Sequence, residues 1–185
     1  PVVQIGTLSV GGSLAVTGTM TSTGAVSAGG DLSVTSATVT GSTLNVGGNL
    51  TLGSTATLNG AVTVGGAVDV TGSASLGASV TSTGAPRWRS AVDITANVGI
   101  NGNGLTFDGN LNGPHRLALT DSGNTTIAGA IGNVSAPLHF EANGAGTTTI
   151  DLQGNFGPGV FTDGGLSFEG ATLTLNGVVS GAGRL

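Results

Sequence analysis

The chain has 185 residues, of which 36 are glycine and 27 are threonine, and only 7% are charged. Soluble domains usually carry about a quarter charged residues and about 7% glycine, so this composition argues against a conventional enzyme domain and favours many short strands joined by tight turns. The net charge of −5, the few scattered arginines, the lack of cysteine and the lack of any long apolar run argue against a nucleic-acid surface, disulfides, thiolate metal sites and a membrane span.

A six-residue repeat runs from residue 7 to residue 84 as thirteen consecutive units with no insertion, among them TLNVGG, NLTLGS and AVTVGG. The second and fourth positions are apolar in 22 of 26 cases, and the exceptions are Ser22, Thr38, Thr40 and Ser82. The sixth position is glycine nine times and otherwise serine or alanine. Alternation with a period of two is typical of a β-strand, so each unit predicts a short strand with two inward side chains and a turn at the small residue.

One such unit cannot be stable alone. Burying two aliphatic side chains contributes roughly 3–6 kcal/mol, which is less than the cost of ordering six residues at about 1–2 kcal/mol each. The strands must therefore stack and share one core, and three units make a triangular coil of about 18 residues. We predict an all-β fold, a single-stranded parallel β-helix or β-solenoid, with a hexad-repeat region over residues 1–84. A gapless six-residue period leaves too little chain for a meander or a sandwich.

The repeat breaks at residues 85–89, where proline, tryptophan and arginine, three of the rarest residue types of the chain, cluster. Because tryptophan and arginine are enriched at binding hot spots, Arg87, Trp88 and Arg89 are candidate residues of a contact loop for a ligand or partner. The interpretation that we favour is a wider loop or a change of cross-section in which Trp88 covers exposed core. Pro86 cannot donate to a strand ladder and fits both interpretations.

A looser pattern, apolar-x-apolar-x-Gly-x-apolar, follows in the second half of the chain. The glycines of its four copies are Gly109, Gly129, Gly154 and Gly177. This spacing predicts larger coils of about 20–25 residues in the region 85–185, with loops of variable length at one corner. We expect these coils to continue the same shaft. All five phenylalanines lie in this half, which is consistent with a wider core.

Segments of both halves resemble known bacterial surface proteins. GLTFDGNLNG and NTTIAGAIGN resemble the repeats of filamentous-haemagglutinin-type exoproteins, and LTLNGVVSGAGRL is similar to the strand repeat of autotransporter passenger regions. The hexads resemble low-complexity repeats of the same proteins and stretches of phage tail fibres. The resemblance implies a right-handed parallel β-helix shaft of a secreted or surface-displayed protein that acts in adhesion and aggregation. It carries over no catalytic motif, and no secretion domain or translocator barrel is recognised, so we expect a segment of a longer shaft.

Groups able to carry chemistry are sparse. Asp151 and Glu169 lie on different predicted coils, and we interpret them as solvated residues, not as a general acid–base pair. Neither histidine has a partner at metal-ligand spacing. The segment from Asp163 distantly resembles a calcium-binding glycine repeat, so a calcium site near Asp163 or Asp121 stays open. We predict no catalytic residue and no cofactor.

These observations predict a non-catalytic structural or adhesive shaft segment of an extracellular or cell-surface bacterial fibre. Its expected partners are its own copies or the rest of a longer passenger chain, joined end to end, and a cell-surface or glycan partner. The alternatives are a self-assembling extracellular filament, an ice-binding solenoid and a phage tail-fibre segment. Ice binding requires Thr-x-Thr pairs stacked in register. Under the strict repeat, the pairs that stack on Thr19/Thr21 are Ala37/Val39, Thr55/Thr57 and Ser73/Ser75, so we expect that array to be interrupted.

Overall fold

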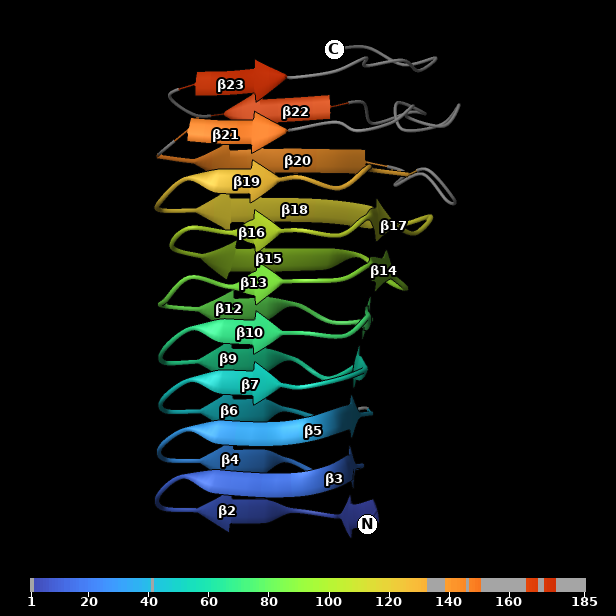
Figure 1. Ribbon diagram of the computed structural model, residues 1–185, viewed down its shortest axis with the longest axis vertical. Helices are drawn as coiled ribbons and strands as arrows, with labels where there is room; N and C mark the ends of the chain where they lie inside the picture. Colours follow the sequence, from blue (N-terminus) through green and yellow to red (C-terminus); the bar gives the residue numbers. More distant parts are fainter. Residues whose placement is uncertain are drawn as a thin grey trace.

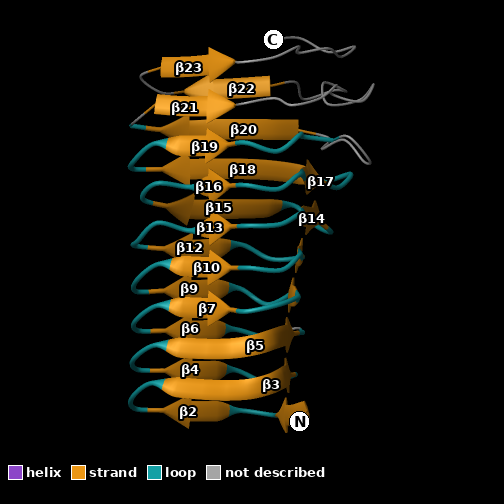
Figure 2. Ribbon diagram, in the orientation of Figure 1, coloured by secondary structure: helices purple, strands orange, loops and turns teal. Residues whose placement is uncertain are grey.

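The chain forms a parallel β-solenoid of about seven turns, which confirms the predicted fold class. The structure, a computed structural model, describes residues 2–40, 42–132, 139–145, 147–150, 166–169 and 172–175. From β3 to β18, each coil places one strand on each of three faces, so that this part of the stack has the shape of a three-sided prism (Figure 1). Within these residues every regular element is a strand (Figure 2), and no helix is long and apolar enough to cross a membrane.

The three faces are named here in chain order. Face 1, whose strands point to the right in Figure 1, comprises the first halves of β3 (Leu14–Ser22) and β5 (Leu32–Val39), then β7 (Leu50–Leu52), β10 (Val68–Val70), β13 (Arg87–Trp88), β16 (Thr106–Phe107), β19 (Thr125–Ile127), β21 (Thr147–Ile150) and β23 (Thr172–Leu175). Face 2, at the right edge of Figure 1, comprises β1 (Val2–Ile5), the second halves of β3 and β5, β8 (Ala56–Leu58), β11 (Ala74–Leu76), β14 (Val92–Ile94) and β17 (Leu111–Asn112).

Face 3 is a separate sheet of nine strands behind face 1. These are β2 (Leu8–Val10), β4 (Val26–Ala28), β6 (Leu44–Val46), β9 (Val62–Val64), β12 (Val80–Ser82), β15 (Val98–Gly102), β18 (Arg116–Asp121), β20 (His139–Gly144) and β22 (Leu166–Glu169). Strands β3 and β5 bend around one corner and join faces 1 and 2 into a single 14-stranded sheet.

Coil length is given by the strand register. On face 3, Leu44 pairs with Val62 and Val62 pairs with Val80, so these coils have the length of about 18 residues that the hexads predict. Val80 then pairs with Ile100, which is a longer step, and the steps from β18 to β20 and from β20 to β22 are longer still. The coils therefore lengthen in the second half. Pairing of β10 with β13 continues the face 1 ladder across residue 85.

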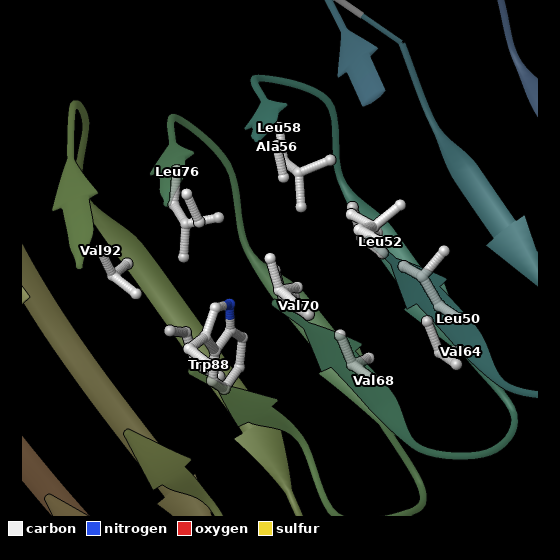
Figure 3. Packing of buried hydrophobic residues seen from close by; sticks show 14 of the residues in the cluster. Leu50, Leu52, Ala56, Leu58, Val64, Val68, Val70, Leu76, Trp88 and Val92 are labelled. Carbon is white, nitrogen blue, oxygen red and sulfur yellow. The ribbon is translucent and has the colours of Figure 1, made fainter. Parts of the chain in front are cut away.

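The core is one continuous column of aliphatic side chains. Buried and outward residues alternate along most strands from β4 to β19, and the inward leucines and valines of successive coils stack on one another (Figure 3). Each fully buried leucine or valine contributes roughly 1.5–3 kcal/mol. The inward serines are satisfied by backbone carbonyls, because Ser22 Oγ donates to Gly24 O at 2.6 Å and Ser82 Oγ donates to Gly66 O at 2.6 Å. The hexad prediction for these two polar positions is confirmed.

The hexad prediction is wrong at residues 37–40. It points Thr38 and Thr40 inward, whereas Ala37 and Val39 are buried and Thr38 pairs with Thr57 on the outer side. The physical reason is that a strand directs its apolar residues to the core, and a shift of one residue exchanges the two sides of a strand. On face 2 the step from β3 to β5 is one residue shorter than the regular coil, the step from β5 to β8 is one residue longer, and the regular period is then restored.

This shift also overturns the expectation of an interrupted hydroxyl array on face 2. The residues that follow Thr19 and Thr21 in register are Ser36 and Thr38, not Ala37 and Val39. The column then continues without a break to β8 and β11.

A ladder of polar side chains holds the corner between faces 3 and 1. Ser13 Oγ accepts a hydrogen bond from the N–H of Asp31 at 3.0 Å, and Asp31 Oδ1 accepts one from the N–H of Asn49 at 2.7 Å. Asn49 Oδ1 in turn accepts from the N–H of Ala67 at 2.9 Å. Each side chain therefore satisfies a backbone donor of the next coil at a corner where the chain leaves its strand.

Candidate functional site around Trp88

The three candidate contact residues lie in and directly after strand β13. Arg87 and Trp88 pair with Asp69 and Val70 of the preceding coil, and with residues 106 and 107 of the following coil. Arg89 continues the ladder, since its N–H donates to Val70 O at 2.9 Å. The structure therefore has a strand where the sequence predicts a loop, because the alternation of inward and outward residues persists through the break.

Trp88 is a core residue, with only 1% of its surface exposed. Its indole stacks on the ring of Phe107 in the next coil, with ring centroids 4.7 Å apart and planes inclined by 6°. Figure 3 shows the indole pointing inward, toward the interior that Val70 and Leu76 also line. The favoured interpretation of a change in core cross-section agrees with this position, whereas direct contact between the ring and a partner would require the coil to open.

Gly102 on face 3 leaves room for the side chains of Pro86 and Leu105 at the corner between faces 3 and 1. A Cβ atom at Gly102 would lie 2.6 Å from Pro86 Cδ and 2.9 Å from Leu105 Cδ2, closer than van der Waals contact allows. Glycine at this inward position therefore lets the side chains of two larger residues fill the corner. Trp88 Nε1 is buried without a hydrogen-bond partner among the described residues, so the stability of the coil depends on ring packing.

The arginines on either side of Trp88 point outward and pair with aspartates of neighbouring coils. Arg89 forms a two-point ion pair with Asp69, with N–O distances of 2.8 and 2.6 Å. Arg87 Nε lies 2.8 Å from Asp108 Oδ2. The hydrogen bond from Arg89 holds the pKa of Asp69 below its usual value. The two guanidinium groups thus bridge three successive coils on face 1, and both remain partly exposed to a partner.

We expect the double substitution Arg87→Gln and Arg89→Gln to leave the fold intact. Exposed ion pairs contribute little net stability, so the melting temperature measured by circular dichroism should fall by no more than about 4 °C. The variant distinguishes a role in partner binding from a role in stability. Binding of a partner to this patch would be lost, whereas the solenoid would stay folded. If the melting temperature fell as much as it does for a core substitution, the two arginines would be structural residues and the expectation would be wrong.

A second polar cluster lies inside the solenoid, at the corner between faces 3 and 1. Its centre is Asp121, which is 3% exposed. The carboxylate accepts hydrogen bonds from Gly104 N at 2.7 Å, Leu105 N at 2.9 Å, Gly123 N at 2.9 Å and Thr125 Oγ1 at 2.7 Å. Gly104, which supplies one of these donors, has a φ of 92°, a conformation that favours glycine.

The surroundings of Asp121 do not fit the calcium site that the sequence left open there. A calcium ion requires several oxygen ligands, whereas the partners of this carboxylate are three backbone N–H groups and one hydroxyl donor. Burial alone would raise the pKa of Asp121, but these hydrogen bonds outweigh it and hold the pKa below its usual value. Asp121 is therefore a buried anion that ties two coils together.

Among the residues that the structure describes, the remaining candidates form no second site. Asp151 and Asp163 lie outside the described residues, and Glu169 is described only as the last residue of β22. Within the described part of the chain no group of three or more His, Asp or Glu side chains could hold a metal ion. One depression of about 260 Å³ lies on face 3 beside Gly99 and Arg116, and another of about 160 Å³ lies on face 1 beside Ser33 and Thr51. Neither contains a carboxylate.

Sequence reasoning missed two polar features of the structure, the corner ladder and the Asp121 cluster. The Ser13–Asp31–Asn49 ladder could have been found, because polar side chains stand at the first position of three hexads that lie 18 residues apart. The Asp121 cluster had a weaker signal, namely an aspartate at the end of a strand with a threonine shortly after it.

Comparison with known proteins identifies no relative. No protein-family model, no curated protein and no solved structure matches the chain. What the fold defines is therefore a class, a parallel β-solenoid built from repeats.

Proposed function

We propose that the chain is a non-catalytic shaft segment of a secreted or surface-displayed bacterial fibre that acts in adhesion, aggregation or matrix formation. The observation that carries the proposal is the stacking of parallel strands on three faces from β3 to β18, which produces length and stiffness. At about 4.8 Å per coil, seven turns extend on the order of 35 Å. We also propose that the fibre is of the filamentous-haemagglutinin or autotransporter-passenger type. The repeat pattern of the sequence supports this assignment.

The described surface supports a mechanical role over a catalytic one. It carries few ionisable side chains. The ion pairs of Arg87 and Arg89 with aspartates join neighbouring coils of the solenoid. The partners that we propose are further coils joined end to end, from the same chain or another copy, and a cell-surface or glycan partner. The edge of a parallel coil offers unpaired N–H and C=O groups to such a further coil.

Electron microscopy of the purified chain over a concentration series, with sedimentation velocity, tests this proposal. Filaments that lengthen with concentration would support a self-assembling fibre, and short monodisperse rods would support a segment of a longer shaft. Irregular aggregates at every concentration, with neither filaments nor a uniform short species, would contradict both.

Ser9 offers a matched variant for end-to-end assembly. Leu8 N–H and Val10 C=O both bond to the next coil, so the backbone N–H of Ser9 between them points to the opposite side. We expect Ser9→Pro to remove that donor and shorten any filaments, whereas Ser9→Ala should leave their length unchanged. Equal filament lengths for both variants would show that this edge takes no part in assembly.

A further inference from the structure

Face 2 carries a two-column array of hydroxyl groups that the shifted register makes continuous. Four successive coils each present two outward hydroxyl residues in a hydroxyl-x-hydroxyl arrangement. They are Thr19 and Thr21 on β3, Ser36 and Thr38 on β5, Thr55 and Thr57 at β8, and Ser73 and Ser75 at β11. All eight are half-buried or exposed, and the residues between them point into the core.

The array is periodic in two directions. Successive coils repeat about every 4.8 Å along the shaft, and alternate residues of a strand are roughly 6.6 Å apart across it. No charged side chain projects from face 2 between β3 and β11, and the array ends at β14, where the outward residue is Asp93. The surface therefore offers regularly spaced hydrogen-bonding groups without a net field.

The hydroxyl groups are also held in place. Threonine is stiff at χ1, which restricts the positions that its hydroxyl and methyl groups can take. Ser36 Oγ lies 2.9 Å from Thr55 Oγ1 and 2.9 Å from Thr55 O, so adjacent coils fix this part of the array by hydrogen bonds. A rigid surface loses little conformational entropy when it binds a rigid partner.

In the coils from β3 to β13, neither of the other faces presents an equivalent surface. The outward column of face 1 is interrupted by Asp69 and Arg87. On face 3 one outward column contains Ala25 and Ala61 in place of hydroxyl residues. The depression beside Ser33 and Thr51 also lies on face 1 of these coils.

We propose that face 2 between β3 and β11 binds ice, an activity separate from the shaft role. The partner that fits is itself a flat, uncharged and regularly spaced lattice of hydrogen-bonding groups, and hydroxyl groups can both donate to it and accept from it. A glycan is the less favoured partner. Sugar rings gain much of their binding energy by packing on aromatic side chains, and the eight residues of the array include none.

Thermal hysteresis and ice shaping by the full chain test the proposal. We expect the parent chain to shape ice crystals and depress their growth temperature. Thr57→Leu, in the centre of the array, should abolish most of this activity, because a bulky side chain without a hydroxyl group disrupts both the hydrogen bonds and the flat contact. The matched control is Thr63→Leu on face 3, which places the same substitution at an exposed outward position and should retain the activity.

Circular dichroism spectra and melting temperatures of both variants ensure that only folded chains are compared. An absence of ice shaping by the parent chain would overturn the proposal, and so would an equal loss in the two folded variants. Sedimentation of the parent chain with insoluble cellulose or chitin tests the alternative that face 2 binds a glycan. Binding to the polysaccharide that Thr57→Leu abolishes, without ice shaping, would reassign face 2 to a glycan.

Discussion

Trp88→Ala is expected to lower the free energy of unfolding by about 3–5 kcal/mol. The indole is buried and stacked on Phe107, so its removal leaves a cavity between two coils and an aromatic ring without its partner. The neighbouring coils cannot close this cavity easily, because their strands are held at fixed spacing by the ladders on either side. Urea unfolding followed by far-ultraviolet circular dichroism measures the loss.

Trp88→Phe is the matched control. It keeps an aromatic ring against Phe107 and removes the buried N–H that lacks a partner, so the lost packing and the removed polar group offset each other. We expect a change below about 1.5 kcal/mol. A loss of less than about 1 kcal/mol for Trp88→Ala would show that the ring contributes little to the core, and would return Trp88 to the group of candidate contact residues.

Asp121→Asn is expected to lower the free energy of unfolding by about 3 kcal/mol at pH 7. The carboxylate accepts four hydrogen bonds, and three come from backbone N–H groups at a corner of the coil. An amide in the same place turns its NH₂ group toward at least one of these donors, which leaves a buried N–H without an acceptor. The matched control is Asp93→Asn, an exposed aspartate on face 2, which should change stability by less than about 0.5 kcal/mol.

The effect of Asp121 depends on pH in a defined direction. Its pKa in the folded chain lies below its usual value, so the folded state favours the ionised carboxylate. The stabilisation is fully present above the pKa of the unfolded chain, near pH 4, and is lost as the pH falls through the folded pKa. The difference in melting temperature between the parent and Asp121→Asn should therefore be constant from pH 7 to pH 5 and shrink toward pH 3. A difference that grows as the pH falls would contradict this assignment.

Much of the fold could be predicted because its rule is local. Alternation of apolar and small polar residues identifies inward and outward positions. A single hexad buries too little apolar surface to be stable alone, so the strands must stack. The shift at Ala37 and Val39 was missed because a fixed six-residue period was applied across it, although Thr38 and Thr40 at supposedly inward positions were the signal. The Trp88 segment was harder, since its strand is fixed by pairing with β10 and β16, which belong to the preceding and following coils.

The candidate site was predictable only in part. The sequence places Arg87, Trp88 and Arg89 together, but it does not show that the arginines pair with Asp69 and Asp108 on other coils. Those partners lie a full coil away along the chain, and their approach depends on the exact coil length. The Asp121 cluster has the same origin, because two of its donors, Gly104 and Leu105, belong to the preceding coil.

The short step on face 2, and the long step that follows it, have a consequence for how such a chain can change during evolution. A residue lost at one corner is compensated by a residue gained at a later corner, and the strands beyond them return to their original alignment. We therefore expect paired single-codon deletions and insertions at corners to be tolerated, whereas the same changes within a strand would turn its apolar side outward. In this protein the corners are where length varies, and the strands conserve the direction in which each side chain points.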